Sequence, residues 1–127
     1  LAQDNPDLEF ILPLHPNPNV QKYKHLLNNV NVMSPLSHFE LLNILVKCRL
    51  LISDSGGLQE ESSFLNKKII VCRKITERPE GIESGHLYIY NSPGELRQQF
   101  DHLKVNFYIN SGCPYGDGHA SSKVLSE

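Results

Sequence analysis

Residues 54–61 read Asp54-Ser55-Gly56-Gly57-Leu58-Gln59-Glu60-Glu61 and follow the apolar run Leu50-Leu51-Ile52. An apolar run that leads into two adjacent glycines and then into a helical pattern predicts a buried strand, a tight turn and a helix N-terminus. Glycines let a ligand approach the backbone closely, and the first N–H groups of a helix attract anions. Further along this helix, the carboxylate of Glu61 can accept hydrogen bonds from sugar hydroxyls. The stretch therefore predicts a site for the phosphates and the sugar of a nucleotide.

The sequence on either side alternates between predicted strands and predicted helices. Apolar runs predict strands at residues 9–14, 31–33, 49–53, 69–72 and 87–90. Helical spacing predicts helices at residues 20–28, 58–65, 93–103 and 118–125. A further helix, with an apolar stripe that includes Phe39 and Leu45, is predicted to begin near Ser37, with Glu40 as its capping-box partner. Strands joined by helical crossovers predict an α/β domain with a doubly wound parallel sheet, whose ligands bind at the carboxyl ends of the strands.

Length and composition favour one domain with a small ligand. The 127 residues are 39% hydrophobic and 20% charged, which is enough to form a core. A net charge of −2 gives no reason to expect nucleic acid or an anionic membrane surface as a partner. No apolar run approaches the roughly 20 residues of a membrane helix, and three cysteines without a Cys-x-x-Cys pattern fit a reducing compartment. We expect a cytoplasmic chain whose residues 1–127 belong to one domain.

Two further loops are predicted at the same edge of the sheet. The segment Thr76-Glu77-Arg78-Pro79-Glu80 follows the strand after the glycine turn, and its arginine could neutralise a diphosphate. His15, in the loop 15–19, follows the first strand. The alternatives are an ordinary glycine turn, a surface ion-pair cluster and a loop histidine held by the backbone. The other histidines have no spacing typical of metal ligands, so we expect no metal site.

The blocks Asp-Ser-Gly-Gly-x-Gln-Glu-Glu (54–61), Thr-Glu-Arg-Pro-Glu (76–80) and Pro-Tyr-Gly-Asp-Gly (114–118) together resemble the C-terminal domain of bacterial non-hydrolysing UDP-N-acetylglucosamine 2-epimerases. The loop 15–19 also resembles a loop of that family, and the resemblance spans nearly the whole chain. It implies two Rossmann-like domains arranged as in GT-B glycosyltransferases, with UDP-sugar held between them. This chain would then be a UDP-binding C-terminal domain that lacks its first strand and the N-terminal catalytic domain.

The resemblance implies a role for five residues around the glycine turn. Ser55, Gly56 and Gly57 would bind the diphosphate of UDP. Glu61 would bind the ribose hydroxyls, and Arg78 would face the phosphates or the sugar.

The resemblance also implies two sites earlier in the chain. A main-chain group of Leu36 and the side chain of residue 41 would contact the uracil ring. The family usually has an aromatic ring at that second position, whereas this chain has Leu41, with Phe39 nearby as a substitute for stacking. His15 matches a histidine of a second, allosteric site for UDP-N-acetylglucosamine.

The implied reaction interconverts UDP-N-acetylglucosamine and UDP-N-acetylmannosamine by elimination of UDP and its re-addition to the other face of the sugar. The family draws its catalytic carboxylates from the N-terminal domain, so no catalytic residue is assigned in this chain, and we expect binding without turnover. No cofactor is implied, and the complete protein would be a homodimer. Two alternatives are a hydrolysing relative, which releases free N-acetylmannosamine and UDP, and a non-catalytic domain that binds nucleotide sugars. The Thr-Glu-Arg-Pro-Glu block favours the non-hydrolysing enzyme.

Overall fold

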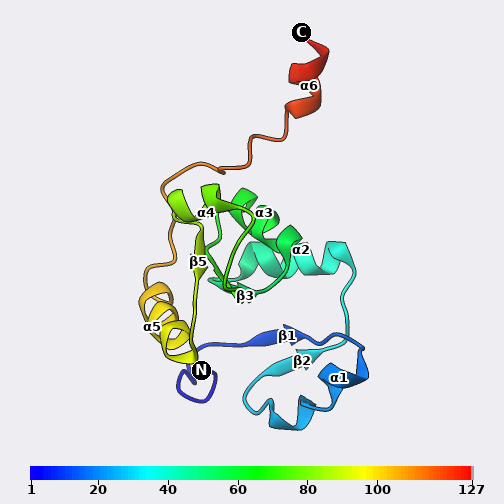
Figure 1. The fold of residues 1–127 in the computed structure, drawn as a ribbon. Helices are drawn as coiled ribbons and strands as arrows, with labels where there is room; N and C mark the ends of the chain where they lie inside the picture. The colour runs from blue at the N-terminus through cyan, green and yellow to red at the C-terminus, as the bar shows by residue number, and fades with distance from the viewer. Residues whose placement is uncertain (127) are drawn as a thin grey trace. The chain divides into compact units, whose positions relative to one another are not determined.

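The computed structural model describes residues 1–126 and is shown as a ribbon in Figure 1. The chain divides into two compact units, Leu1–Ile44 and Leu45–Glu127. We describe the two units one after the other.

The first unit contains a two-stranded parallel sheet. Strands β1 (Ile11–Pro13) and β2 (Asn31–Met33) pair with Ile11 opposite Asn31. Between them lie the short helix α1 (Pro18–Gln21) and the 3-10 turn η1 (Lys24–Leu26).

The prediction of one helix over residues 20–28 was wrong. Helix α1 begins earlier because Pro18 occupies its first turn, where a proline costs no hydrogen bond. The Asn17 side chain caps it by accepting a hydrogen bond from the Asn19 N–H at 2.9 Å. Helical structure ends before Asn29, whose φ of 64° lies in the left-handed region.

Helix α2 (His38–Lys47) confirms a local sequence signal. The Ser37 N–H donates to Oε2 of Glu40 at 2.8 Å, and the Glu40 N–H donates to Oγ of Ser37 at 3.3 Å. These reciprocal bonds form a capping box, as the sequence predicts. Of the apolar stripe of this helix, Leu45 is buried, whereas Phe39 remains exposed.

The second unit contains a three-stranded parallel sheet in the order β3–β4–β5. Its strands are β3 (Leu51–Ser53), β4 (Ile69–Val71) and β5 (Leu87–Ile89). Strand β4 lies in the centre, and its three residues are completely buried. An apolar strand that is covered on both faces is the pattern of a parallel sheet between helices.

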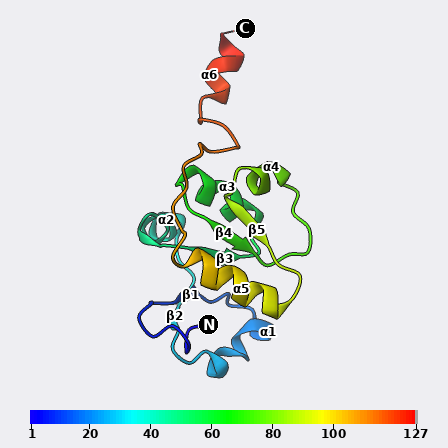
Figure 2. The same ribbon diagram turned by 90° about the vertical axis from the view of Figure 1, so that its left-hand side faces the viewer.

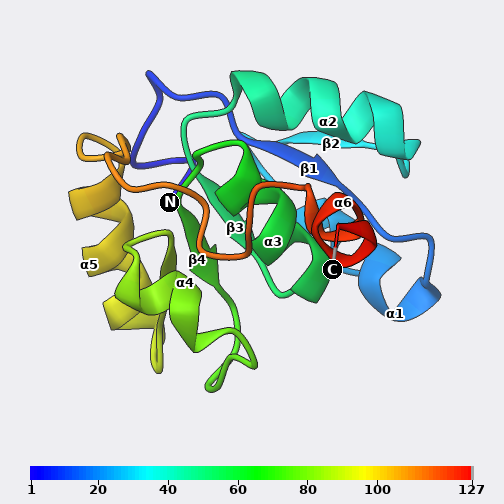
Figure 3. The same ribbon diagram turned by 90° about the horizontal axis from the view of Figure 1, so that it is seen from above.

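Among the described residues, four helices lie entirely within the second unit. They are α3 (Gly56–Phe64), α4 (Pro79–Glu83), α5 (Pro93–Leu103) and α6 (Ala120–Leu125). Figures 2 and 3 show α3 and α5 on opposite sides of the strands. Phe100 and Leu103 of α5 are buried with the strand residues and complete the core.

The α/β class and the parallel direction of the strands are confirmed. The hydrogen bonds group the five strands into two ladders. The sequence could not predict this grouping, because β-α alternation specifies crossovers but does not specify which strands become neighbours. Helix α4 was not predicted, although Pro79 at its first position is a recognised start signal. Helix α6 begins at Ala120, two residues later than predicted.

Candidate functional site

The N-terminus of α3 is built by two serines and two glycines. Oγ of Ser53 accepts a hydrogen bond from the Ser55 N–H at 3.1 Å, which fixes the turn after β3. Ser55 is the N-cap of α3, and its Oγ accepts from the Leu58 N–H at 3.4 Å. Gly56 and Gly57 form the first turn of the helix, which therefore begins two residues earlier than predicted. The first N–H groups of this turn have no acceptor within the helix and suit an anion.

Arg78 lies directly beside this first turn. A Cβ atom added to Gly56 would lie 3.2 Å from Nη1 and 3.5 Å from Nη2 of Arg78. Any larger residue at position 56 would therefore displace the guanidinium slightly. The glycine turn and the 76–80 segment therefore meet, as expected for loops that follow two neighbouring parallel strands.

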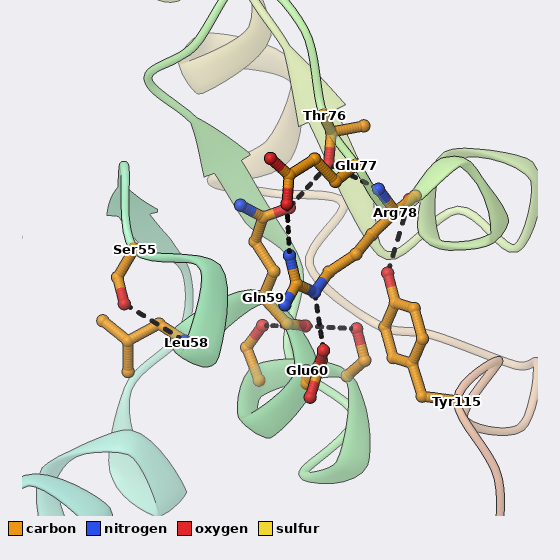
Figure 4. Close-up of polar contacts among 10 residues, drawn as sticks. Ser55, Leu58, Gln59, Glu60, Thr76, Glu77, Arg78 and Tyr115 are labelled. Atoms are coloured by element: carbon orange, nitrogen blue, oxygen red, sulfur yellow. Dashed lines mark hydrogen bonds and ion pairs between the residues drawn. The ribbon is translucent and has the colours of Figure 1, made fainter.

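Two carboxylates orient the guanidinium of Arg78 (Figure 4). Its Nε donates a hydrogen bond to Oε1 of Glu60 at 2.7 Å, and its Nη1 lies 4.0 Å from Oε2 of Glu77. The hydrogen bond to Glu60 raises the pKa of Arg78 above its ordinary value, so this side chain stays cationic. A fixed cation beside a helix N-terminus is a favourable environment for phosphate.

Glu61 extends the site along α3. An added Cβ on Gly57 would lie 4.0 Å from its Oε1, so the carboxylate reaches back toward the first turn. Its Oε2 is buried and has no hydrogen-bond partner among residues 1–126. A buried carboxylate oxygen without a donor is costly, and hydroxyl groups of a ligand would satisfy it.

Sequence reasoning missed two polar side chains that support the backbone of Arg78, buried Gln59 and half-buried Thr76. Gln59 is 1% exposed, and its Oε1 accepts a hydrogen bond from Oγ1 of Thr76 at 2.8 Å. Oγ1 of Thr76 in turn accepts from the Arg78 N–H at 3.1 Å. The one sequence signal for this contact was Gln59 itself, a polar side chain in the first turns of α3 at a position that faces the core.

Tyr115 approaches the same segment from the 114–118 block. Its hydroxyl donates to the carbonyl oxygen of Arg78 at 3.5 Å (Figure 4). Burial raises the pKa of Tyr115, so the phenol stays protonated and able to donate.

The remaining predicted residues lie in the first unit. His15 is exposed, and its Nδ1 accepts a hydrogen bond from the Asn17 N–H at 3.1 Å. This contact places the ring proton of the neutral histidine on Nε2. Leu36 and Leu41 are half-buried, while Phe39 is 76% exposed.

Among residues 1–126, no group of three or more histidine, cysteine, aspartate or glutamate side chains is arranged to hold a metal ion. Within the same range, no helix combines the length and the apolar character needed to cross a bilayer.

Comparison with known proteins gives a consistent result over the whole chain. The family model described as UDP-N-acetylglucosamine 2-epimerase matches residues 1–127. A UDP-N-acetylglucosamine 2-epimerase of Campylobacter jejuni is 36% identical over 99% of this chain, and one of Bacillus subtilis is 35% identical over 95%. These alignments cover 36% and 34% of the two relatives, so the chain spans about a third of their length.

Solved structures show the same similarity. A UDP-GlcNAc 2-epimerase of Neisseria meningitidis, bound to UDP-GlcNAc, matches with a TM-score of 0.75 and 31% identity. The S. aureus MnaA protein, in a structure with UDP, matches with a TM-score of 0.84 and 30% identity. Each comparison covers 98% of this chain, and they cover 37% and 36% of the solved chains, respectively.

Proposed function

Because the chain belongs to the UDP-N-acetylglucosamine 2-epimerase family, we propose that its second unit binds the UDP portion of a UDP-sugar at the N-terminus of α3. The observation that carries this proposal is the meeting of the Arg78 guanidinium with the glycine turn at Gly56. It combines a permanent cation, a helix N-terminus and a backbone without Cβ atoms at one place.

The diphosphate would bind to the first turn of α3. The N–H groups of Gly56 and Gly57 and the hydroxyl of Ser55 would donate to its oxygens, since the Ser55 N–H is engaged with Ser53. The guanidinium of Arg78 would offset its charge. Nη1 and Nη2 of Arg78 lie nearest to Gly56, while Nε is engaged with Glu60. The two terminal nitrogens are therefore the donors that would bind phosphate.

The ribose would bind at Glu61. Two neighbouring hydroxyl groups are hydrogen-bond donors, and a carboxylate accepts from both. The Glu61 oxygen that has no partner among the described residues supports this assignment. The uracil contacts of Leu36 and Leu41 and the allosteric role of His15 stay predictions from the resemblance.

For the complete protein, we propose the non-hydrolysing epimerase reaction. A base removes the proton at C2 of the sugar while the C1–O bond breaks, so UDP leaves and a 2-acetamidoglucal forms. UDP then adds back to C1, and a proton returns to C2 from the opposite face. The acid and base groups would come from an N-terminal domain outside this chain, and the complete protein would act as a homodimer in the cytoplasm.

Titration calorimetry of this chain with UDP tests the proposed site. We expect binding in the unmutated chain and markedly weaker, still measurable binding in Glu61→Ala and in Arg78→Ala. Glu83→Ala and Arg97→Ala are matched controls, because each removes the same charge from α4 or α5. Unchanged binding in both site variants would show that UDP does not occupy this turn.

An assay that identifies the reaction type requires the complete protein. Incubation with UDP-N-acetylglucosamine should yield UDP-N-acetylmannosamine in equilibrium with the substrate. Steady accumulation of UDP together with free N-acetylmannosamine would identify the hydrolysing enzyme instead. If the complete protein binds UDP-N-acetylglucosamine and produces neither product, it is a binding protein without this activity.

A further inference from the structure

Arg78 is carried by a segment that depends on side chains for its conformation. Strand β4 ends at Val71 and helix α4 begins at Pro79, so residues 72–78 connect the two. Backbone ladders fix residues within a strand, whereas a connection of this kind depends on specific side-chain bonds. The backbone position from which the Arg78 side chain extends is therefore set by the bonds that hold residues 76–78, while Glu60 orients the guanidinium at its end.

Gln59 and Thr76 form that support. Gln59 is 1% exposed, while Thr76 is half-buried and the Arg78 side chain is 24% exposed, so the support is anchored in the core and the side chain that it positions is accessible. The Thr76 hydroxyl donates its single proton to Gln59, which leaves its oxygen to accept from the Arg78 N–H. By accepting this proton, the amide oxygen of Gln59 makes the Thr76 hydroxyl an acceptor toward Arg78.

The same glutamine also belongs to the helix that forms the glycine turn. Its backbone carbonyl accepts hydrogen bonds from Oγ of Ser62 at 3.2 Å and from Oγ of Ser63 at 2.8 Å. Both serines are completely buried. Gln59 is therefore anchored in α3 at its backbone and joined to the Arg78 segment at its side chain.

We propose that Gln59, acting through Thr76, is a positioning residue that sets the distance between the Arg78 guanidinium and the first turn of α3. This inference rests on the proposed UDP site. It adds that the affinity for the diphosphate depends on a hydrogen-bond relay from buried Gln59 through half-buried Thr76, outside the proposed phosphate contacts. Glu60, which binds Nε from the exposed side of the helix, orients the end of the same side chain.

Conservative variants of Thr76 separate positioning from general stability. Thr76→Val keeps the shape and removes the hydroxyl, whereas Thr76→Ser keeps the hydroxyl and removes the methyl group. Loss of one such hydrogen bond should weaken UDP binding roughly three- to tenfold in Thr76→Val. Thr76→Ser should bind like the unmutated chain. Gln59→Leu should reproduce the loss, and Gln59→Leu combined with Thr76→Val should lose no more than either variant alone.

An Arg78→Ala background provides the decisive control. If the relay acts through the guanidinium, Thr76→Val should have no further effect on UDP binding once Arg78 is alanine. Amide hydrogen exchange gives a second readout that needs no ligand, since the Arg78 N–H should exchange faster in Thr76→Val and in Gln59→Leu. Thermal unfolding of each variant checks that the chain is folded.

The outcomes distinguish this inference from the proposed function. If the unmutated chain does not bind UDP, the proposed site and the relay built on it both fail. If UDP binds and Thr76→Val binds it equally well, only the positioning role is overturned. An additive loss in the Arg78→Ala background would also overturn it, because the threonine would then act independently of the guanidinium.

Discussion

The guanidinium of Arg78 and the carboxylate of Glu60 are joined by a hydrogen bond of 2.7 Å between Nε and Oε1. Glu60 is half exposed, with 51% of its side chain accessible, so solvent screens the attraction. The bond therefore orients the arginine and contributes little to folding.

The first prediction concerns the energy of this ion pair. Glu60→Ala should lower the free energy of unfolding by less than about 1 kcal/mol, as is typical of exposed pairs. The loss should shrink further at high salt because the attraction is screened. Urea unfolding at low and high ionic strength measures both effects, with Glu60→Gln as the control that keeps an acceptor. A salt-independent loss of several kcal/mol would contradict this assessment.

The second prediction compares the two glycines of the turn. Gly57→Ala should raise the free energy of unfolding by up to about 1 kcal/mol, because alanine favours the helix and the nearest other atoms are 4.0 Å away. Gly56→Ala should gain less, because its methyl group would press against Nη1 of Arg78 at 3.2 Å. Urea unfolding of both variants tests this. Equal gains would mean that the guanidinium moves aside without cost.

The third prediction concerns Gly81 in α4. A Cβ at this position would collide with Cδ1 of Leu87 and with the hydroxyl of Tyr115. Gly81→Ala should therefore lower the free energy of unfolding by about 1–3 kcal/mol through overpacking. Gly94→Ala is the matched control, since the Cβ atom added there would lie 3.9 Å from Oγ of Ser92, an ordinary van der Waals distance.

A second variant identifies the source of this strain. Tyr115→Phe removes the hydroxyl that the new methyl group would meet. In chemical denaturation, the combination of Gly81→Ala with Tyr115→Phe should recover part of the lost stability. If the combined loss equals the sum of the single losses, the collision with Leu87 alone accounts for the effect.

The fourth prediction concerns pH. His86 is completely buried, and this burial, with a smaller contribution from the charge of Lys68, lowers its pKa below the ordinary 6.5. The unfolded chain then binds a proton at a higher pH than the folded chain does. Stability from neutral His86 is therefore fully present above about pH 6.5 and falls as the pH drops toward the folded pKa.

Thermal unfolding between pH 7.5 and 5.5 should show this loss. Because other groups titrate in the same range, the relevant quantity is the difference between the unmutated chain and His86→Phe. The variant should have a flatter profile below pH 6.5. Parallel profiles would mean that His86 accepts a proton in the folded chain as readily as in the unfolded one.

Local signals were the part of the fold that could be predicted from sequence. The capping box of Ser37 and Glu40 spans a single helical turn, so its partners are near each other in any helix that starts there. The low helix propensity of glycine predicts that α3 begins at Leu58. The helix begins at Gly56 because the cap by Ser55 outweighs that propensity.

Long-range contacts could not be predicted in the same way. Gln59 and Thr76 are 17 positions apart and meet only because β3 and β4 are neighbours in the sheet. The sequence located the loop that carries Arg78 on the same sheet edge as the glycine turn. It contained no pattern from which the hydrogen bonds behind Arg78 could be derived, since these depend on the packing of α3 against β4.

The complete burial of β4 has a consequence for how the second unit opens. Its backbone groups are paired on both sides, with β3 and with β5, and Ile69, Ile70 and Val71 have no accessible surface. Amides in such a strand exchange with solvent only when the whole cooperative unit opens, while connecting segments open by local fluctuation. Residues 72–78 leave β4 directly. We therefore expect amides of this segment to exchange before those of β4, even though side-chain bonds hold Thr76 and Arg78.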